Sequence, residues 1–213
     1  MKNTSILFEI TKRILDIVIS ACALVSFLPL ALLVSIFVII EDGLPVIYIQ
    51  ERVGRYRKLF KLYKFRSMVK NADEILFSDP ELYEAMRSGS HKLENDHRVT
   101  KVGRIIRKYS IDEFPQFLNV LRGEMSVVGP RAYRPDELEK YELENPHIRD
   151  SLDKIQMVKP GITGLWQVGG RSSVAFDERI QIERRYAESH SILLDLYILV
   201  RTPLAVVQAK GAA

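Results

Sequence analysis

The sequence has almost no cysteine and little histidine. Its single cysteine, Cys22, excludes an intramolecular disulfide framework and any cluster of cysteine metal ligands, which agrees with a reducing, cytoplasm-facing site. His91 and His97 lack the i, i+4 spacing of ligands on one helix face and have no partner cysteines. We therefore expect no metal site built on histidine or cysteine.

Charge is missing from one long segment, Ile17–Ile40, which has 24 residues without Asp, Glu, Lys or Arg. At about 1.5 Å per residue, such a helix is long enough for a hydrocarbon core of about 30 Å. Hydropathy alone predicts a transmembrane helix. A cleaved signal peptide is not expected, because the segment is too long and Glu41-Asp42-Gly43 follows it in place of a cleavage site.

The flanks of this segment favour a re-entrant hairpin over a simple span. Basic residues typical of the cytoplasmic side stand both before and after it. Pro29, near its middle, removes a backbone hydrogen bond and bends the helix, and the Ser26 hydroxyl could satisfy a freed carbonyl. We therefore predict a membrane hairpin over residues 1–43 and a cytoplasmic domain over 44–213. The flanking basic residues are Lys2, Lys12, Arg13, Arg52, Arg55, Arg57, Lys58, Lys61, Lys64 and Arg66.

The rest of the chain predicts an α/β (α+β), mostly helical domain. Alternating apolar and polar residues around Gly54 indicate a strand, a turn and a strand. Their basic residues fit either a solvated edge or contact with anionic head groups. We expect Lys64 and Arg66 to lie near the functional site, which the next segment of the sequence indicates. The other predicted segments are a polar, weakly helical 71–96, a charged helix over 133–157 broken near Asn145-Pro146, a helix over 176–186, and an apolar helix over 193–207 interrupted at Pro203.

The most informative segment is 107–131, which carries two adjacent carboxylates. Apolar residues at i, i+3, i+4 and i+7 predict a short amphipathic helix that ends at Gly123. Proline fits only the first turn of a helix, so Pro115 places Asp112 and Glu113 at or just before the helix start. The apolar positions are Phe114, Phe117, Leu118 and Leu121.

Two interpretations of this pair are open. Ser110-x-x-Glu113 matches a capping box, in which the acidic residues only complement the helix dipole. A cap does not need the surrounding basic residues, whereas carboxylates among guanidinium groups suit an anion and a divalent metal. The second interpretation explains more of the segment. The basic residues are Arg104, Arg107, Lys108, Arg122 and Arg131.

These residues carry a family resemblance. Residues 110–131, Ser-Ile-Asp-Glu-Phe-Pro-Gln-Phe-Leu-Asn-Val-Leu-Arg-Gly-Glu-Met-Ser-Val-Val-Gly-Pro-Arg, resemble the signature of the bacterial sugar transferases, the monotopic polyprenyl-phosphate glycosyl-1-phosphate transferases. Three further motifs extend the resemblance over nearly the whole chain. They are Lys12-Arg13-x-x-Asp16, Lys64-Phe65-Arg66-Ser67-Met68 and the segment from Lys159 to Arg171.

The resemblance implies an enzyme on the cytoplasmic face of the bacterial inner membrane. Such enzymes transfer a sugar-1-phosphate from a UDP-sugar to polyprenyl (undecaprenyl) phosphate, releasing UMP, as the first membrane step of capsule, exopolysaccharide, O-antigen (lipopolysaccharide) or glycoprotein assembly. It also implies a helix that dips into one leaflet and is kinked, here at Ser26 to Pro29.

The resemblance also assigns roles to individual residues. Asp112 would be the nucleophile that forms a covalent aspartyl-phosphosugar, and Asp112 and Glu113 would hold Mg²⁺. Arg107, Arg131 and Arg171, with Lys64 and Arg66 nearby, would bind the donor. Lys12, Arg13 and Asp16 would lie at the membrane surface near the lipid phosphate. The chain departs from the family pattern at His97 and Ala132, where proline is usual, and at Glu183, where aspartate is frequent.

The competing interpretation is a non-catalytic, membrane-associated module that recruits acidic lipid or a partner enzyme. That role does not need a carboxylate pair within a group of arginines. A nucleic-acid binder is not expected, because the basic residues flank an apolar block rather than an exposed aromatic platform. The sequence identifies neither the sugar nor the pathway, and it is compatible with a homodimer.

Overall fold

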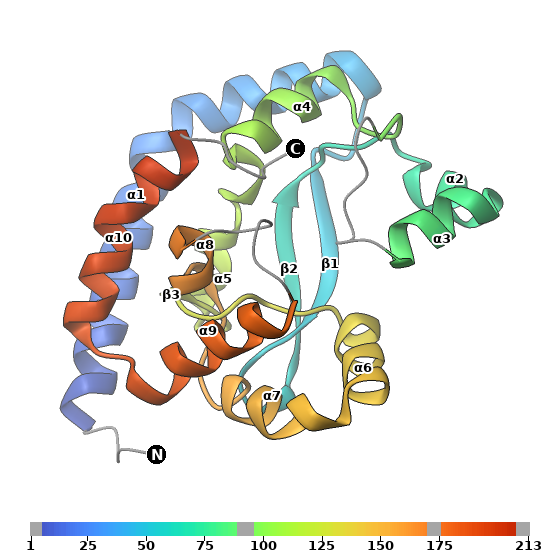
Figure 1. Cartoon of the computed structure of the whole chain (residues 1–213). Helices are drawn as coiled ribbons and strands as arrows, with labels where there is room; N and C mark the ends of the chain where they lie inside the picture. The colour runs from blue at the N-terminus through green and yellow to red at the C-terminus, as the bar shows by residue number, and fades with distance from the viewer. Residues whose placement is uncertain (1–5, 89–95, 170–175, 208–213) are drawn as a thin grey trace.

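The computed structural model describes residues 6–88, 96–169 and 176–207. It is mostly helical, and its longest element is the helix α1 (Ile6–Asp42), which has Pro29 inside it. This helix is long and apolar enough to cross a membrane by length and composition. It changes direction along its length, running up the left of Figure 1 and then across the top.

The predicted strand, turn and strand are present as a two-stranded antiparallel sheet. β1 (Ile47–Val53) pairs with β2 (Leu59–Phe65) in a register that sets Ile47 opposite Phe65 and Val53 opposite Leu59. A short 3₁₀ turn, η1 (Arg55–Arg57), joins the two strands. Every second side chain of β2 is therefore directed to the same face.

Short helices make up most of the remaining described chain. The polar segment forms α2 (Ala72–Ser78) and α3 (Pro80–Ser88), and the charged segment forms α6 (Pro135–Glu144), η3 (Pro146–Ile148) and α7 (Arg149–Ile155), with the break at the predicted proline. The other elements are α4 (Lys101–Lys108), η2 (Ile111–Glu113), α5 (Gln116–Arg122), α8 (Leu165–Gly169), α9 (Phe176–Ser189) and α10 (Ile192–Val207).

The C-terminal apolar helix differs from the prediction in one respect. The sequence predicted an interruption at Pro203, but α10 continues through this residue to Val207. One face of α10 packs on the core through Ile198, whose side chain is fully buried, whereas Leu193 and Val200 are about 80% exposed. The helix thus keeps an uncovered apolar side.

A short parallel pair of strands, which the sequence did not predict, lies at the centre of the molecule. β3 (Ser126–Val128) and β4 (Gly161–Thr163) pair in parallel. Just after β3, the backbone at Gly129 passes very close to the backbone at Lys159. A Cβ on Gly129 would lie 2.4 Å from the carbonyl oxygen of Lys159. A side chain at this position would therefore displace the segment that leads to Arg131.

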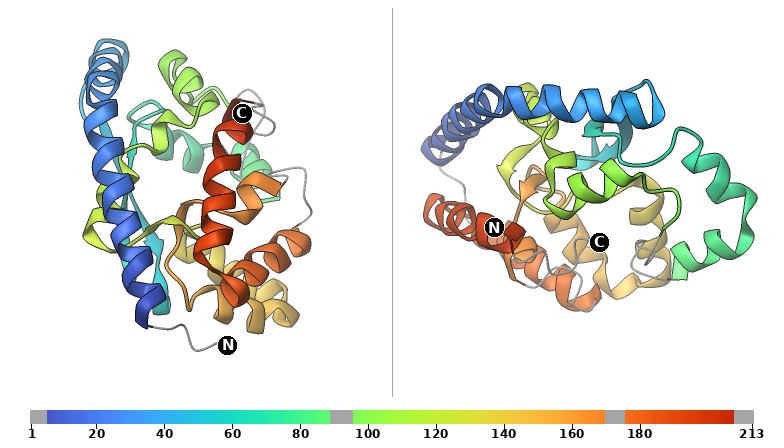
Figure 2. Two further views of the ribbon diagram at one scale, coloured as in Figure 1. Left: turned by 90° about the vertical axis from the view of Figure 1, so that its left-hand side faces the viewer. Right: turned by 90° about the horizontal axis from the view of Figure 1, so that it is seen from above.

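Three apolar clusters hold these elements together. The first joins β2, α5, β3, α9 and α10, and the second joins α6, α7 and α9. The third contains Val34 and Val38 of α1 with Phe65 and Ile106, so the C-terminal half of α1 packs on β2 and α4. Figure 2 shows α1 (blue) and α10 (red) as separate helices on one side of the molecule.

Candidate active site

The carboxylate pair lies in η2, the 3₁₀ turn between α4 and α5. Pro115 takes the N-cap position of α5, and Gly123 ends this helix with a φ of 81°, so both predicted boundaries are confirmed. Ser110 precedes the turn in the left-handed conformation and makes no side-chain capping hydrogen bond. The capping-box interpretation is therefore wrong.

The two carboxylates have different surroundings. Asp112 is 8% exposed, and Glu113 receives a hydrogen bond of 2.8 Å from Lys64 Nζ. Burial raises the pKa of Asp112 to about 6, with Lys64 opposing this shift and the charge of Glu113 adding to it. Burial also acts to raise the pKa of Glu113, but Lys64, Arg131 and Arg52 together outweigh burial, and the pKa is lowered.

A large cleft of about 1830 Å³ contains this pair. It exceeds the roughly 300–1,000 Å³ of a typical small-molecule site, so it has room for more than one ligand. Arg107 and Arg131, both predicted, line this cleft, as do Arg104 and Lys108. Arg122 does not, because its guanidinium binds the Tyr63 hydroxyl and stacks over that ring.

Arg66 and Arg171 were also predicted to bind the donor. Arg66 also lines the cleft, but its guanidinium binds the carbonyl oxygen of Gly43 at 2.6 Å and lies 3.2 Å from the Asp42 carboxylate. Arg66 thus secures the C-terminal end of α1 to β2. Arg171 lies outside the described residues.

The Lys12, Arg13 and Asp16 side chains contact protein groups, and their position near a lipid phosphate stays a prediction. Lys12 Nζ lies 2.5 Å from the Asp195 carboxylate and 3.0 Å from the Val128 carbonyl oxygen. Arg13 donates to the last carbonyls of α5, at Val120 and Leu121. Asp16 accepts from the Ser126 hydroxyl and the Val127 amide, both at 2.9 Å. This motif attaches α1 to α5, β3 and α10.

The predicted kink residues also differ in detail. Pro29 lies within α1, which bends but is not broken into two helices. Ser26 is exposed, and in the part of the chain that the structure describes its hydroxyl forms no hydrogen bond. Instead, the Ser35 hydroxyl donates a hydrogen bond of 2.7 Å to the carbonyl oxygen of Ala31, one turn earlier in the helix.

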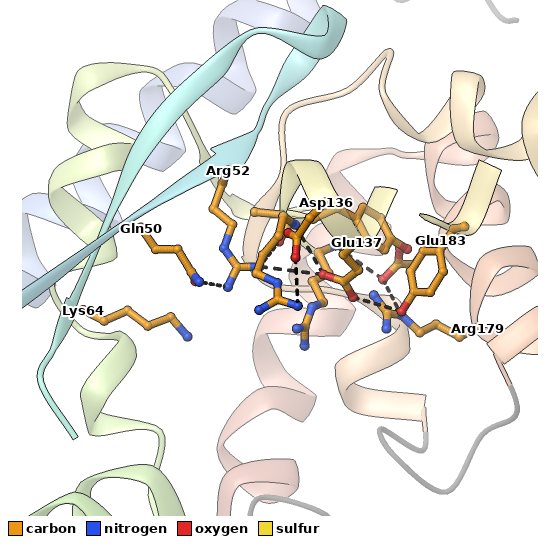
Figure 3. A network of polar contacts seen from close by, with 12 residues as sticks. Gln50, Arg52, Lys64, Asp136, Glu137, Arg179 and Glu183 are labelled. Atoms are coloured by element: carbon orange, nitrogen blue, oxygen red, sulfur yellow. Dashed lines mark hydrogen bonds and ion pairs between the residues drawn. The ribbon is translucent and has the colours of Figure 1, made fainter. Parts of the chain in front are cut away.

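A buried polar network behind Arg131 was not predicted as part of the site. Arg52 donates to the Ala132 carbonyl at 2.9 Å and lies 4.0 Å from the Glu137 carboxylate. Figure 3 shows a row of polar side chains that runs from Arg52 through Glu137 to Glu183 and Arg179, with Lys64 at the Arg52 end. Burial alone would raise the pKa of Glu137, but Arg131, Arg179 and Arg52 lower it to about 2.

Glu183 connects this network to the backbone of Arg131. Its carboxylate accepts from the Arg131 amide at 3.4 Å and from the Tyr133 hydroxyl, and it lies 3.5 Å from Arg179 Nε. The sequence marked Glu183 only as a family position. The sequence offered one indication for Arg52, which is its place in the strand pair that also carries Gln50 and Lys64. Glu137 and Arg179 could not be told from ordinary surface charges of helices.

The chain is similar to known proteins along nearly its whole length. The family model described as bacterial sugar transferase matches residues 7–209. The exopolysaccharide production protein ExoY of Sinorhizobium fredii is 41% identical over 208 residues, which cover 95% of this chain and 88% of that protein.

Two longer relatives have names that state an activity. An undecaprenyl-phosphate galactose phosphotransferase of Salmonella typhimurium is 44% identical, over 94% of this chain and 41% of its own length. A UDP-N-acetylgalactosamine-undecaprenyl-phosphate N-acetylgalactosaminephosphotransferase of Aeromonas hydrophila is 35% identical, over 97% of this chain and 46% of its own length. The chain thus spans less than half of either protein. Because the family model covers nearly the whole chain, the chain belongs to the bacterial sugar transferase family.

Proposed function

We propose that this protein transfers a sugar-1-phosphate from a UDP-sugar to a polyprenyl phosphate such as undecaprenyl phosphate. The observation that carries the proposal is the carboxylate pair, buried Asp112 and partly exposed Glu113, in a cleft lined by Lys64, Arg107 and Arg131. Both substrates are anionic, so cations must offset their charge before a nucleophile approaches phosphorus. The names of the Salmonella and Aeromonas relatives support the same chemistry.

In the first step, the Asp112 carboxylate attacks the phosphorus that bears the sugar. The bond from this phosphorus to the bridging oxygen breaks, and UMP leaves with the electron pair. In the second step, an oxygen of the lipid phosphate attacks the same phosphorus, and the bond to Asp112 breaks. The carboxylate is regenerated, and the product is a polyprenyl-diphosphate-sugar. A covalent intermediate divides one difficult displacement into two easier ones.

The surrounding residues have distinct tasks in this scheme. Lys64 keeps Glu113 ionised, and Arg107 offsets negative charge close to Asp112. Arg131 extends from a segment that Glu183 holds by its backbone amide and that Arg52 holds through the next carbonyl. The network behind Arg131 therefore fixes the position of a guanidinium that binds the diphosphate.

The carboxylate pair also suits Mg²⁺, which binds through one or two carboxylates together with substrate phosphates and water. Within residues 6–88, 96–169 and 176–207, no group of three or more His, Cys, Asp or Glu could hold a metal ion. Asp112 and Glu113 would therefore hold Mg²⁺ together with the donor. When bound, the metal would supply neutralisation of diphosphate charge.

Metal removal tests this assignment. Chelation should abolish UMP release, and added Mg²⁺ should restore it. Glu113→Gln should raise the Mg²⁺ concentration that gives half-maximal activity, whereas Glu178→Gln on the exposed side of α9 should not. Full activity in excess chelator would contradict the role of the pair.

The covalent step is tested by giving the purified enzyme UDP-sugar without lipid acceptor. We expect a gain in protein mass equal to one sugar-phosphate and a stoichiometric burst of UMP, because the first step needs no acceptor. Asp112→Asn should abolish both, since an amide cannot form the acyl phosphate. Asp153→Asn, an exposed change on α7, should keep them.

Two results would each reject the covalent scheme. One is a wild-type enzyme that turns over with acceptor present but shows neither adduct nor burst at saturating donor. The other is an Asp112→Asn variant that keeps more than a small fraction of turnover. Direct transfer between the two bound substrates would then replace it. A wild-type protein without any UMP release would instead favour the non-catalytic module.

A further inference from the structure

The cleft that contains the carboxylate pair is bounded at one end by the two outer apolar helices. Ala23 and Phe27 of α1 line it, and so do Pro203, Val206 and Val207 of α10. Phe114 and Phe117, which follow the carboxylate pair in the chain, line the space as well. We call this end, made by these seven residues, the apolar end of the cleft.

Aromatic rings connect the membrane helix directly to the catalytic turn. The ring centroids of Phe27 and Phe114 are 4.9 Å apart, and those of Phe114 and Phe117 are 5.4 Å apart. Phe114 is covalently next to Glu113. A group that follows these rings from the carboxylate pair therefore arrives at α1 beside the bend.

The apolar end is only partly covered by the protein itself. Phe27 is 45% exposed and Val207 is 75% exposed. Figure 2 shows α1 and α10 standing apart on the outside of the molecule. Large exposed apolar surfaces of this kind mark sites for a ligand, a partner or a membrane.

The two ends of the cleft match the two parts of one kind of molecule. Lys64, Arg107 and Arg131 lie at the end with the carboxylates and suit a phosphate, whereas the rings and aliphatic side chains suit a hydrocarbon chain. We propose that the isoprenoid chain of the acceptor leaves the carboxylate pair along Phe114 and Phe27 and enters the membrane between α1 and α10. This inference rests on the proposed function and adds the path of one substrate to it.

The continuity of the cleft selects this occupant over another protein. The same cleft contains the nucleophile and the apolar end, so an acceptor phosphate next to Asp112 already places its first isoprene units on Phe114. A protein segment bound there would block the approach to Asp112. The path also makes α10, and not only α1, part of the acceptor site.

The test separates the two half-reactions. UMP release without acceptor reports donor chemistry, and the KM for undecaprenyl phosphate reports the acceptor. Phe27→Ala should raise this KM about tenfold, since removing an aromatic contact of this kind costs about 1.4 kcal/mol. It should leave the burst of UMP unchanged.

A matched control and a second variant complete the design. Phe37→Ala removes a ring of similar exposure on α1 that does not line the cleft, so the KM should stay constant. Val206→Thr, an almost isosteric polar change on α10, should raise the KM for undecaprenyl phosphate as well.

The outcomes are distinguishable. An unchanged KM in both Phe27→Ala and Val206→Thr would overturn the proposed path, and an effect of Phe27→Ala alone would overturn the part assigned to α10. A lost burst in Phe27→Ala would show that the ring supports the catalytic turn, and this too would overturn the path. Failure of the proposed function appears separately, as a wild-type protein that releases no UMP.

Discussion

The two residues of the carboxylate pair have pKa values that are shifted in opposite directions. Asp112 and Glu113 are neighbours in sequence, yet burial raises the pKa of the first whereas Lys64 lowers the pKa of the second. Such a difference is how two acidic groups take different roles at one pH. The sequence predicted the pair and its place before α5. It did not predict the difference in pKa, which depends on the tertiary contact between Lys64 of β2 and Glu113, 49 positions further along the chain.

This difference predicts the pH dependence of the first half-reaction. Asp112 must be ionised to attack phosphorus, and its pKa is raised to about 6 by burial. Adduct formation should therefore fall as the pH drops through about 6. In Lys64→Met the lost positive charge should raise the pKa further and shift the acid limb to higher pH. The measurement is the mass of the adduct formed in a single turnover at each pH.

Lys61→Met provides the control, because Lys61 lies on the same strand but is exposed and does not line the cleft. Its pH profile should match that of the wild type. An acid limb that stays in place when Lys64 is replaced would disprove the electrostatic link between this ammonium and the pair.

At the level of elements, the attachment of α1 adds contacts that the sequence did not predict. The family resemblance implied that its charged motif lies at the membrane surface near the lipid phosphate, and this stays a prediction. The structure directs Lys12 to Asp195 of α10 and Asp16 to β3. Sequence patterns could not reveal these partners, which lie more than 100 residues away. The strands, the break at Pro146 and the helix end at Gly123 were predictable because each depends on local residues.

The ion pair between Lys12 and Asp195 should contribute to stability. The two side chains are 16% and 7% exposed, so Lys12→Met leaves a buried carboxylate without its cation. Breaking such a pair costs about 3 kcal/mol, and we expect thermal unfolding in detergent to occur at a clearly lower temperature. The double variant Lys12→Met with Asp195→Asn should lose less than the sum of the single variants.

Lys140→Met serves as the comparison, because the Lys140–Glu144 pair of α6 is more exposed and should change the unfolding temperature much less. Equal effects of the two replacements would show that the pair between α1 and α10 is no stronger than a surface pair.

For the whole molecule, the attachments at both ends of α1 bear on its position in the membrane. Near its start, Asp16 is held by β3. At its end, the Glu41 carboxylate accepts from the amides of Lys101 and Val102 at 2.7 and 2.9 Å, and Arg66 binds the Gly43 carbonyl. Both ends therefore contact the same folded domain, which cannot lie on both sides of a bilayer. This arrangement supports a re-entrant helix that enters and leaves by one face.

Labelling of the two termini tests this topology. We predict that a tag before residue 1 and a tag after residue 213 both react only from the cytoplasmic side, because basic residues flank the apolar segment on both sides and both ends of α1 contact the same folded domain. Pro29→Ala restores the missing backbone hydrogen bond and favours a straight helix, so it should move part of the N-terminal tag to the opposite side and lower activity by detaching Lys12 and Asp16. Pro203→Ala, a proline replacement within α10, should leave both tags in the cytoplasm. If the two wild-type tags are found on opposite sides, α1 spans the membrane, and the contacts at one of its ends cannot persist in the bilayer.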